Sequence, residues 1–314
     1  MVGIMDLSVC FVAFGPRHLG SSRLRAWNVA EAWGVPCIVW DDEDLPSLLI
    51  ADVFIVQKVY PQPHRNFATK LHQWVRQARA LGKQVIWDLC DPIWYWMPDE
   101  EFRDLAALMS AVVVSSGGLQ VFLEEDHGIK ATVIEDRLPY QNVFKRHESQ
   151  AVPTLVWFGY SSNRMPCFSA AALPLQRLLS NGIPFKLKII DNAPEQQLAA
   201  NSALASVTSH VRWSEDTFIP ELLTSDIALL PPYPGNWGEM KSGNKMMTAA
   251  WSGLPVSDGI SYTYLRDLVT NPPYRQTEGE WMRQWAETHY DVRQSVTEWM
   301  ALCTHLSQPV QEER

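Results

Sequence analysis

The chain alternates short runs of β-forming residues with stretches of helical periodicity, and this pattern occurs twice along its length. Parallel strands need long crossover connections, usually helices, so the alternation predicts parallel sheets covered by helices on both faces. In the first half the predicted strands are Leu7–Phe14, Pro36–Trp40, Val53–Gln57, Gln84–Trp87, Ala111–Ser115 and Thr132–Ile134. The clearest helix between them is His64–Leu81, where apolar residues recur at helical spacing up to Gly82.

The alternation restarts after His147–Pro153, a polar run that ends in proline and predicts a linker. The second set of strands is Thr154–Gly159, Phe185–Asp191, a strand near Val211, Asp226–Leu230 and Pro255–Ser257. Its predicted helices are Ser169–Ser180, Glu195–Ala205, Phe218–Thr224 and Ser242–Ser252, and Glu278–Ser307 also has a helical pattern. The pattern predicts two Rossmann-like doubly wound domains, 1–147 and 148–275, and helices in 276–314 that cross back to the first domain.

Composition supports this organisation and narrows the function classes. A chain of 314 residues suits two domains of about 150 residues each. The formal charge of −9, without a basic run, argues against a sequence-independent grip on duplex DNA. The five cysteines are scattered without a CxxC pair, so we expect reduced thiols and a cytoplasmic protein, with no structural zinc. No apolar stretch is long enough to predict a membrane span.

Ser225–Gly259 carries most of the functional information. A predicted strand leads through a Pro/Gly-rich loop into a helix that starts near Ser242. On that helix the apolar residues share one side, and the other side gathers Lys241, Asn244, Lys245 and Thr248. Backbone N–H groups at a helix start and two ammonium groups favour a diphosphate, which is the leaving group when an activated sugar is transferred. The alternative is a solvated helix face with ordinary lysines.

The first predicted domain has a candidate ligand loop directly after its first strand. This loop runs from Gly15 into the next helix, and the cleft residues expected from it are His18, Gly20, Ser21, Ser22, Arg23 and Arg25. The two arginines lie at the predicted helix start, near the edge of the sheet where ligands of such folds collect. They are alternatively two surface arginines at a helix terminus.

A second cluster in the first domain is the segment VIWDLCDPIWYW, residues 85–96. It places Asp88 and Asp91 just past a strand end, where a carboxylate can orient an acceptor hydroxyl or act as a general base. Trp94 and its aromatic neighbours offer faces for stacking on sugar rings. Alternatively, Asp91 starts a turn before Pro92 and Asp88 caps a neighbouring helix.

Three segments resemble family 4 ("group 1") glycosyltransferases. The run SDIALLPP…KSGNKMMTAAWSGLPV resembles the C-terminal signature of the family, in which an aspartate-led strand precedes a KS-x-NK helix and a Gly-Leu-Pro-Val turn. The segments SSGGLQVFLEEDHGIKATVIEDRLP and TLVWFG are similar to the end of the family's first domain and the opening strand of its donor domain. The similarity spans about residues 7–300.

The resemblance implies a GT-B fold, in which two Rossmann-like domains face a cleft. It also implies a glycosyltransferase that uses a nucleoside-diphosphate sugar and retains anomeric configuration. No catalytic metal and no cofactor beyond the donor are implied, and the two-domain pattern argues against the metal-binding, single-domain GT-A type. The acceptor would be a saccharide, a lipid-linked group or another hydroxyl.

The family's motifs assign roles to individual positions. The donor-binding residues implied are Gly159, Tyr160, Trp213, Lys241, Ser242, Asn244, Lys245 and Thr248. Lys241 and Lys245 would neutralise the leaving diphosphate. Arg23 or Arg25 would assist, because SSRLR is similar to the S-x-R-x-R element of some members. Asp88 or Asp91 would position the acceptor.

Two departures from the family keep other functions open. Thr248 stands where the family often has a ribose-binding Glu, and Tyr160–Arg164 replaces a common Arg/Lys pair. A degenerate GT-B module that holds a nucleotide or glycan without turnover is therefore the first alternative. A second alternative keeps the enzyme but makes its acceptor a modified, hydroxymethylated nucleic-acid base, as in phage DNA glycosyltransferases.

Overall fold

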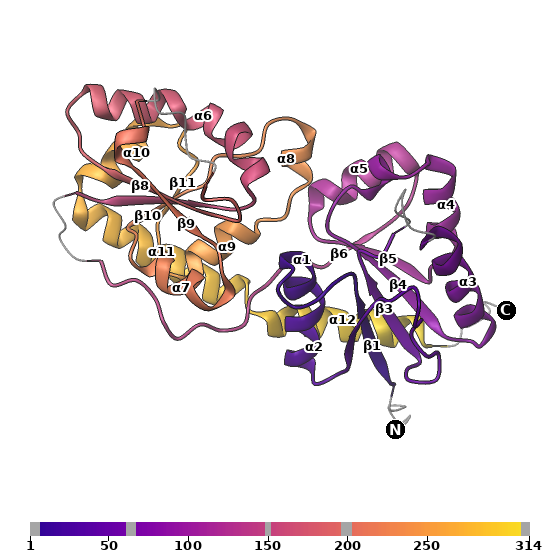
Figure 1. Cartoon of the computed structure of the whole chain (residues 1–314). Helices are drawn as coiled ribbons and strands as arrows, with labels where there is room; N and C mark the ends of the chain where they lie inside the picture. The colour runs from indigo at the N-terminus through magenta and orange to yellow at the C-terminus, as the bar shows by residue number, and fades with distance from the viewer. Residues whose placement is uncertain (1–6, 61–66, 148–151, 196–202, 309–314) are drawn as a thin grey trace. The chain divides into compact units, whose positions relative to one another are not determined.

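The computed structural model describes residues 7–60, 67–147, 152–195 and 203–308, and these divide into two compact units (Figure 1). Unit 1 comprises Met1–Pro139, Glu239–Ser242 and Val292–Arg314, and unit 2 comprises Tyr140–Gly238 and Gly243–Asp291. The central residues of the predicted linker His147–Pro153, positions 148–151, lie outside the described residues.

Unit 1 is built on a parallel sheet with strand order β2-β1-β3-β4-β5-β6. Its strands are β1 (Val9–Ala13), β2 (Cys37–Val39), β3 (Val53–Gln57), β4 (Gln84–Leu89), β5 (Ala111–Val114) and β6 (Thr132–Val133). All six fall within or beside the strands predicted from the sequence. The order reverses between β1 and β3, and ligands of open parallel sheets bind beyond the strand ends at such a reversal.

Helices cover both faces of the unit 1 sheet. They are α1 (Gly20–Ser22), a π-helical turn (Arg23–Trp27), α2 (Asn28–Trp33), α3 (Phe67–Ala80), a 3-10 turn (Ile93–Trp96), α4 (Asp99–Leu108), α5 (Gly117–His127) and α12 (Val292–Leu306). One apolar core lies between the sheet and α3, α4 and α5, and a second lies between the sheet and α2 and α12. The helix predicted at His64–Leu81 corresponds to α3, and its predicted first residue, His64, lies outside the described residues.

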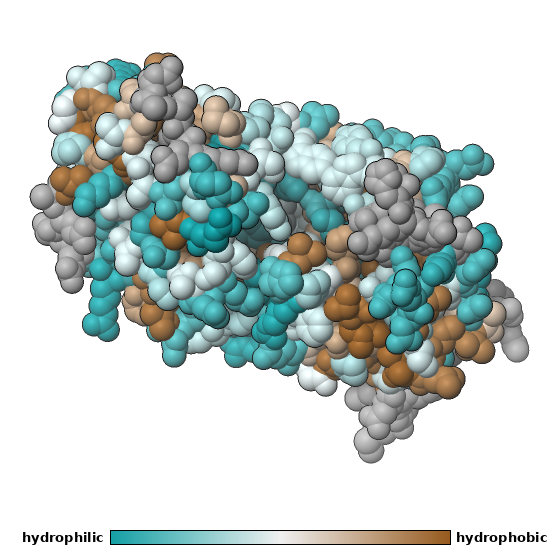
Figure 2. Space-filling view, in the orientation of Figure 1, coloured by the Kyte–Doolittle hydropathy of each residue, from teal (hydrophilic) through white to brown (hydrophobic). Residues whose placement is uncertain are grey.

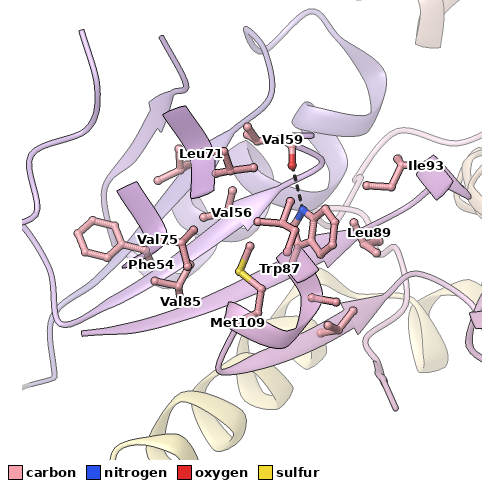
Figure 3. Packing of buried hydrophobic residues seen from close by; sticks show 14 of the residues in the cluster. Phe54, Val56, Val59, Leu71, Val75, Val85, Trp87, Leu89, Ile93 and Met109 are labelled. Carbon is pink, nitrogen blue, oxygen red and sulfur yellow. Dashed lines mark hydrogen bonds between the residues drawn. The ribbon is translucent and has the colours of Figure 1, made fainter. Parts of the chain in front are cut away.

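The first of these cores shows how the β3–β4 edge is fixed (Figure 3). Trp87 of β4 is fully buried, and its indole Nε1 donates a hydrogen bond of 2.9 Å to the carbonyl oxygen of Val59. A buried Trp needs such a partner for its N–H group. The bond holds the chain just after β3 against β4, which positions the residues that follow both strands.

Unit 2 is built on a parallel sheet with strand order β11-β10-β7-β8-β9. Its strands are β7 (Thr154–Phe158), β8 (Lys186–Asp191), β9 (Thr208–Arg212), β10 (Ile227–Leu229) and β11 (Val256–Ser257). In chain order this is the Rossmann arrangement, and it reverses between β7 and β10. Two Rossmann-like parallel sheets with helices on both faces confirm the predicted fold class.

The helices of unit 2 match the predictions in part. They are α6 (Ser161–Ser180), a 3-10 turn (Ala205–Val207), α7 (Glu215–Leu223), α9 (Asn244–Trp251), α10 (Tyr262–Thr270) and α11 (Pro272–His289), while α8 (Asn236–Met240) spans the unit boundary at Glu239. Helices α7 and α9 begin within three residues of the predicted starts, α6 and α11 begin earlier than predicted, and α10 was not predicted. The predicted helix Glu195–Ala205 falls largely outside the described residues. The helical stretch predicted at Glu278–Ser307 is two helices, because α11 ends at His289 and α12 starts at Val292.

Exposed apolar side chains of unit 1 include Leu45, Leu49 and Ile50, which follow β2. Figure 2 shows hydrophobic residues gathered in the lower right of the view, while most of the rest of this face is hydrophilic. None of these three residues was singled out by the sequence, and the polar edges of the two sheets hold the candidate site residues instead.

The stretch from Tyr140 to His147 is fastened to the rest of unit 2. Arg283 lies within 5.5 Å of the ring centroids of Tyr140, Phe144 and Trp251. His147 bonds the carbonyl oxygen of Gly253 through Nε2 at 2.8 Å. These contacts fix the chain before it enters β7.

His147 makes unit 2 sensitive to acid. Burial lowers the pKa of His147 below its ordinary value of 6.5, and the cations of Lys145 and Arg275 lower it further against the opposing effects of Gly253 and Asp226. As the pH drops through 6.5, His147 therefore binds a proton in the unfolded chain before it does so in the folded chain. The free energy of unfolding decreases over this range. We expect the urea concentration at the unfolding midpoint of unit 2 to be lower at pH 5.5 than at pH 7.5.

The control for this prediction is His147→Gln, which keeps a side-chain donor and cannot titrate. Burial also lowers the pKa of His210, so a residual slope is expected in this variant. An unchanged slope in His147→Gln contradicts the assignment.

Candidate active site

The loop after β1 lies at the strand reversal of unit 1. Ser22 is fully buried, and its hydroxyl donates to Gln57 Oε1 at 3.0 Å and accepts the Gly15 N–H at 3.1 Å. Gly20 starts α1, Ser21 is half-buried beside it and His18 is exposed. The loop after β1 is thus fixed to β3 by Ser22, while His18 faces solvent.

Arg25 occupies the centre of a buried charge network beneath this loop. Its Nε lies 2.9 Å from both carboxylate oxygens of Asp88, and its Nη1 donates to Asp136 Oδ1 and to the carbonyl oxygen of Ile134, each at 2.8 Å. Arg25 is 3% exposed and Asp88 is fully buried. Both oxygens of Asp88 are thus occupied by Arg25. Arg23, at the first position of the π-helical turn, is half-buried.

Asp136 was missed by sequence reasoning. It follows β6 at the same edge of the sheet that carries Asp88, and it is 3% exposed. The available signal was an acidic residue just past a predicted parallel strand, the same kind of signal that identified Asp88 and Asp91.

Asp91 is shared by two ammonium groups. Its Oδ2 lies 2.6 Å from the Nζ of Lys58, and its Oδ1 forms an ion pair with Lys241. Burial raises the pKa of Asp91, but the charges of Lys58 and Lys241 outweigh burial and hold it below its usual range. A carboxylate with a lowered pKa is a weak proton acceptor at neutral pH, so this environment favours an electrostatic role.

Lys241 and Ser242 belong to unit 1 because the segment Glu239–Ser242 packs there. The Ser242 hydroxyl donates to Asp136 Oδ2 at 2.5 Å, and the Ser116 hydroxyl donates to the carbonyl oxygen of Met240 at 2.8 Å. Met240 is 1% exposed. The segment is therefore an integral part of the polar edge of unit 1.

Gly118 allows this segment to approach helix α5. A Cβ atom at Gly118 would lie 2.0 Å from the carbonyl oxygen of Glu239. This clash is with a backbone atom, so a side-chain rotation cannot relieve it. We expect Gly118→Ala to displace the segment and lower the unfolding free energy of unit 1 by about 1–3 kcal/mol, measured by urea unfolding. Gly117→Ala is the matched control, because a Cβ atom there meets nothing within 4 Å. Equal losses in the two variants would contradict the packing.

The aromatic residues after β4 divide between core and surface. Trp94 is 6% exposed and packs against Phe102 and His127, whereas Tyr95 and Trp96 are 54% and 37% exposed. Trp96 also contacts Tyr60, with ring centroids 5.7 Å apart. The rings of Tyr95 and Trp96 are therefore the ones in this segment that a ligand can reach.

In unit 2, Gly159 and Lys245 come together at the strand reversal between β7 and β10. Gly159 follows β7 directly, and a Cβ atom there would lie 2.8 Å from Lys245 Nζ. The same ammonium group lies 5.2 Å from the ring centroid of Trp157. Glycine thus leaves the space into which the Lys245 ammonium extends.

The start of helix α6 lies beside this position. Tyr160 is 55% exposed and precedes the helix, and Ser161 donates its backbone N–H to Asn192 Oδ1 at 2.9 Å. The N-terminus of a helix favours an anion through its N–H groups and dipole. Lys245 and α6 therefore place positive charge at one edge of the unit 2 sheet.

The remaining predicted donor residues of unit 2 have different settings. Trp213 follows β9, where its backbone N–H donates to the carbonyl oxygen of Asp191 and its ring packs against Phe218. Asn244 begins α9, and the Thr248 hydroxyl donates to the Asn244 carbonyl oxygen at 2.7 Å.

Arg164 belongs to the segment Tyr160–Arg164, where the family often has cations, and it lies in the first turn of helix α6 with its side chain turned inward. It is 4% exposed, and its Nη1 lies 3.1 Å from Asp191 Oδ2. The cation nearest Gly159 is accordingly supplied by Lys245 from helix α9.

The described part of the chain has no metal-binding cluster and no membrane-spanning helix. Within residues 7–60, 67–147, 152–195 and 203–308, no group of three or more His, Cys, Asp and Glu residues could hold a metal ion. None of the helices in these ranges has the length and hydropathy needed to cross a membrane.

The sequence matches no known family description and no curated protein. The fold, in contrast, matches solved glycosyltransferases. An alpha-glucosyltransferase solved with UDP-glucose and DNA containing an abasic site has a TM-score of 0.68 at 9% identity, over 95% of this chain and 99% of that one. A Rickettsia africae glycosyltransferase has a TM-score of 0.63 at 10% identity, over 96% and 98%.

TarM of S. aureus, solved as a mutant with UDP, has a TM-score of 0.59 at 13% identity. That match covers 80% of this chain, which spans 55% of the TarM chain. At these identities the comparisons establish the fold. The chain has the GT-B fold of glycosyltransferases.

Proposed function

We propose that the protein is a glycosyltransferase that moves a sugar from a nucleoside-diphosphate sugar to an acceptor hydroxyl. The observation that carries this proposal is the approach of Lys245 to Gly159 beside the start of helix α6, at the strand reversal of unit 2. A fixed ammonium group and a helix N-terminus stabilise the charge that grows on a departing diphosphate. Solved proteins of the same fold carry UDP or UDP-glucose, which supports this donor class.

In this proposal unit 2 binds the donor through Gly159, Tyr160, Asn244 and Lys245, and Trp213 stacks on the base. The resemblance adds Lys241 and Ser242 of unit 1 as diphosphate contacts, with retention of anomeric configuration and no catalytic metal. The acceptor is proposed to meet the polar edge of unit 1, where Arg23 and the exposed rings of Tyr95 and Trp96 lie.

The buried ion pairs suggest revised roles for two predicted residues. Asp88 and Arg25 neutralise each other away from solvent, and Asp136 links Arg25 to Ser242, so we assign this network to holding the helix start after the β1 loop and the segment Glu239–Ser242 in place. Asp91 is assigned to the electrostatics of Lys241, because its lowered pKa disfavours a general base.

The test is incubation with UDP-, GDP-, ADP- and CMP-sugars, with release of free nucleotide measured with and without EDTA. We expect slow hydrolysis of one donor, unchanged by EDTA, and faster release once an acceptor is supplied. Proton NMR of the product reports whether the anomeric configuration is retained. Loss of turnover with EDTA would contradict the metal-independent mechanism.

One observation favours a binding module without turnover. The Thr248 hydroxyl bonds within its own helix, where the family often has a ribose-binding Glu. Tight nucleotide binding without release of nucleotide from any sugar donor, in the presence of a broad acceptor panel, would support this second candidate.

A modified nucleic-acid base is the alternative acceptor. One of the fold matches that span nearly the whole chain is to an enzyme solved with DNA, whereas the net charge of −9 opposes duplex binding. Binding of hydroxymethylated DNA that weakens steeply with salt would favour this acceptor, and salt-independent or absent binding would exclude it.

A further inference from the structure

Lys58, Asp91 and Lys241 form an ion triad in unit 1, in which the carboxylate group pairs with two ammonium groups. Lys58 pairs with Oδ2 of Asp91, and Lys241 pairs with Oδ1. The side chain of Lys58 is 16% exposed and that of Lys241 is 39% exposed. An incoming anion can therefore reach Lys241 more readily than Lys58, so Lys241 is the exchangeable partner of the triad.

Lys58 has a backbone conformation that is unusual for its residue type. Its φ of 55° lies in the left-handed region, and among the described residues it is the single non-glycine with positive φ. Such a conformation is costly for a residue with a long side chain and is typical of functional sites. Lys58 follows β3 at the strand reversal of unit 1, where its N–H donates to the carbonyl oxygen of Asp88 at 2.8 Å.

The surroundings of Lys58 hold its ammonium group in place. Its Nζ lies 5.9 Å from the ring centroids of Phe14 and Trp96, and 2.6 Å from Asp91. Burial lowers the pKa of Lys58, but nearby negative charge, including that of Asp91, more than offsets burial and keeps the group protonated. The Lys58–Asp91 pair is thus the more buried and more constrained of the two ion pairs that Asp91 makes.

We propose that Lys58 is a positioning residue that holds Asp91 as a standing counter-ion for Lys241, and that an incoming diphosphate exchanges with Asp91 for the Lys241 ammonium group. This inference rests on the proposed function, in which Lys241 contacts the donor diphosphate. The exchange swaps one ion pair for another and breaks no covalent bond. It lets Lys241 stay compensated in the empty protein and still be available to the donor.

The exchange predicts opposite effects for the two fixed members of the triad. Asp91→Asn removes the competitor for Lys241, so affinity for a diphosphate should rise. Lys58→Met leaves Asp91 with Lys241 alone and strengthens that pair, so the affinity should fall. A purely structural role would make both variants weaken binding.

The experiment is calorimetric titration of the full chain with inorganic pyrophosphate and with UDP, at low and high salt. We expect Asp91→Asn to bind roughly three- to tenfold more tightly and Lys58→Met roughly three- to tenfold more weakly, with smaller changes at high salt. Lys58→Arg should restore wild-type affinity because it returns the charge. Lys58→Gly removes the charge and also the backbone strain, so its agreement with Lys58→Met shows that charge causes the effect.

A double variant separates exchange from general electrostatics. In the Lys241→Ala background the gain from Asp91→Asn should vanish, because the exchangeable partner is absent. A gain that persists there, or weaker binding in both single variants, overturns the exchange while the proposed function stands. Failure of the wild-type chain to bind either probe overturns the exchange together with the assigned donor. Thermal unfolding of each variant identifies any that lose the fold.

Discussion

Replacing Arg25 by methionine is expected to lower the unfolding free energy of unit 1 by about 3–5 kcal/mol. The substitution removes the guanidinium group that pairs with both Asp88 and Asp136, which are at most 3% exposed, and leaves two buried carboxylates without this counter-ion. Whole domains are stable by about 5–15 kcal/mol, so such a loss would unfold a large fraction of the protein on mild heating. Urea unfolding followed by circular dichroism measures the change.

Arg17→Met is the matched control, because Arg17 also pairs with a carboxylate, Glu31, but both side chains are largely exposed. Exposed pairs contribute about 0–1 kcal/mol. Adding Asp88→Asn and Asp136→Asn to Arg25→Met should recover much of the lost stability, because the uncompensated charges are gone. A loss for Arg25→Met no larger than that for Arg17→Met would show that the network is not stabilising in this way.

Lys245→Ala is expected to reduce kcat/KM for the nucleotide-sugar donor at least about 100-fold, following the cost of removing one fixed charge-stabilising group. Its ammonium group lies in the space that Gly159 leaves at the end of β7. Steady-state release of nucleotide measures the change. Gly159→Ala tests the same contact from the other side, because the new Cβ would lie 2.8 Å from Lys245 Nζ.

Lys186→Ala is the control for general charge, since Lys186 is an exposed lysine at the start of β8, the opposite end of the same sheet from Gly159. It should leave kcat/KM unchanged. If Lys245→Ala keeps both donor affinity and turnover, the diphosphate is bound elsewhere.

The fold was largely predictable because buried strands have a recognisable local composition. β1, β3 and β7 are nearly continuous runs of apolar residues, as expected for strands covered on both faces. Helices α8 and α10 were not predicted, and the helix predicted after the first loop was not expected to open with the π-helical turn Arg23–Trp27. This turn depends on tertiary contacts, such as the buried pairing of Arg25, that no local pattern reveals.

The site was predictable as a set of sheet edges but not as a set of contacts. The sequence placed Asp88, Asp91 and Lys241 among the candidates, yet the pairing of Lys241 with Asp91 joins residues 150 positions apart. Lys58 carried no signal, because its importance comes from a left-handed backbone and from a partner beyond the next strand. Trp87 and Trp94 looked suited to stacking on ligands, but both were needed to fill the core.

The division of unit 1 into three stretches of chain has a consequence for synthesis. Helix α12 closes one face of the unit 1 sheet, where Trp299 packs against Phe11 at a ring separation of 5.9 Å. Domains generally fold in order as they leave the ribosome. Here the first strands of unit 1 are synthesised long before α12, the last helix of the described residues, so the chain of unit 2 is completed first. Until α12 is synthesised, nascent unit 1 exposes an apolar face to which a chaperone can bind.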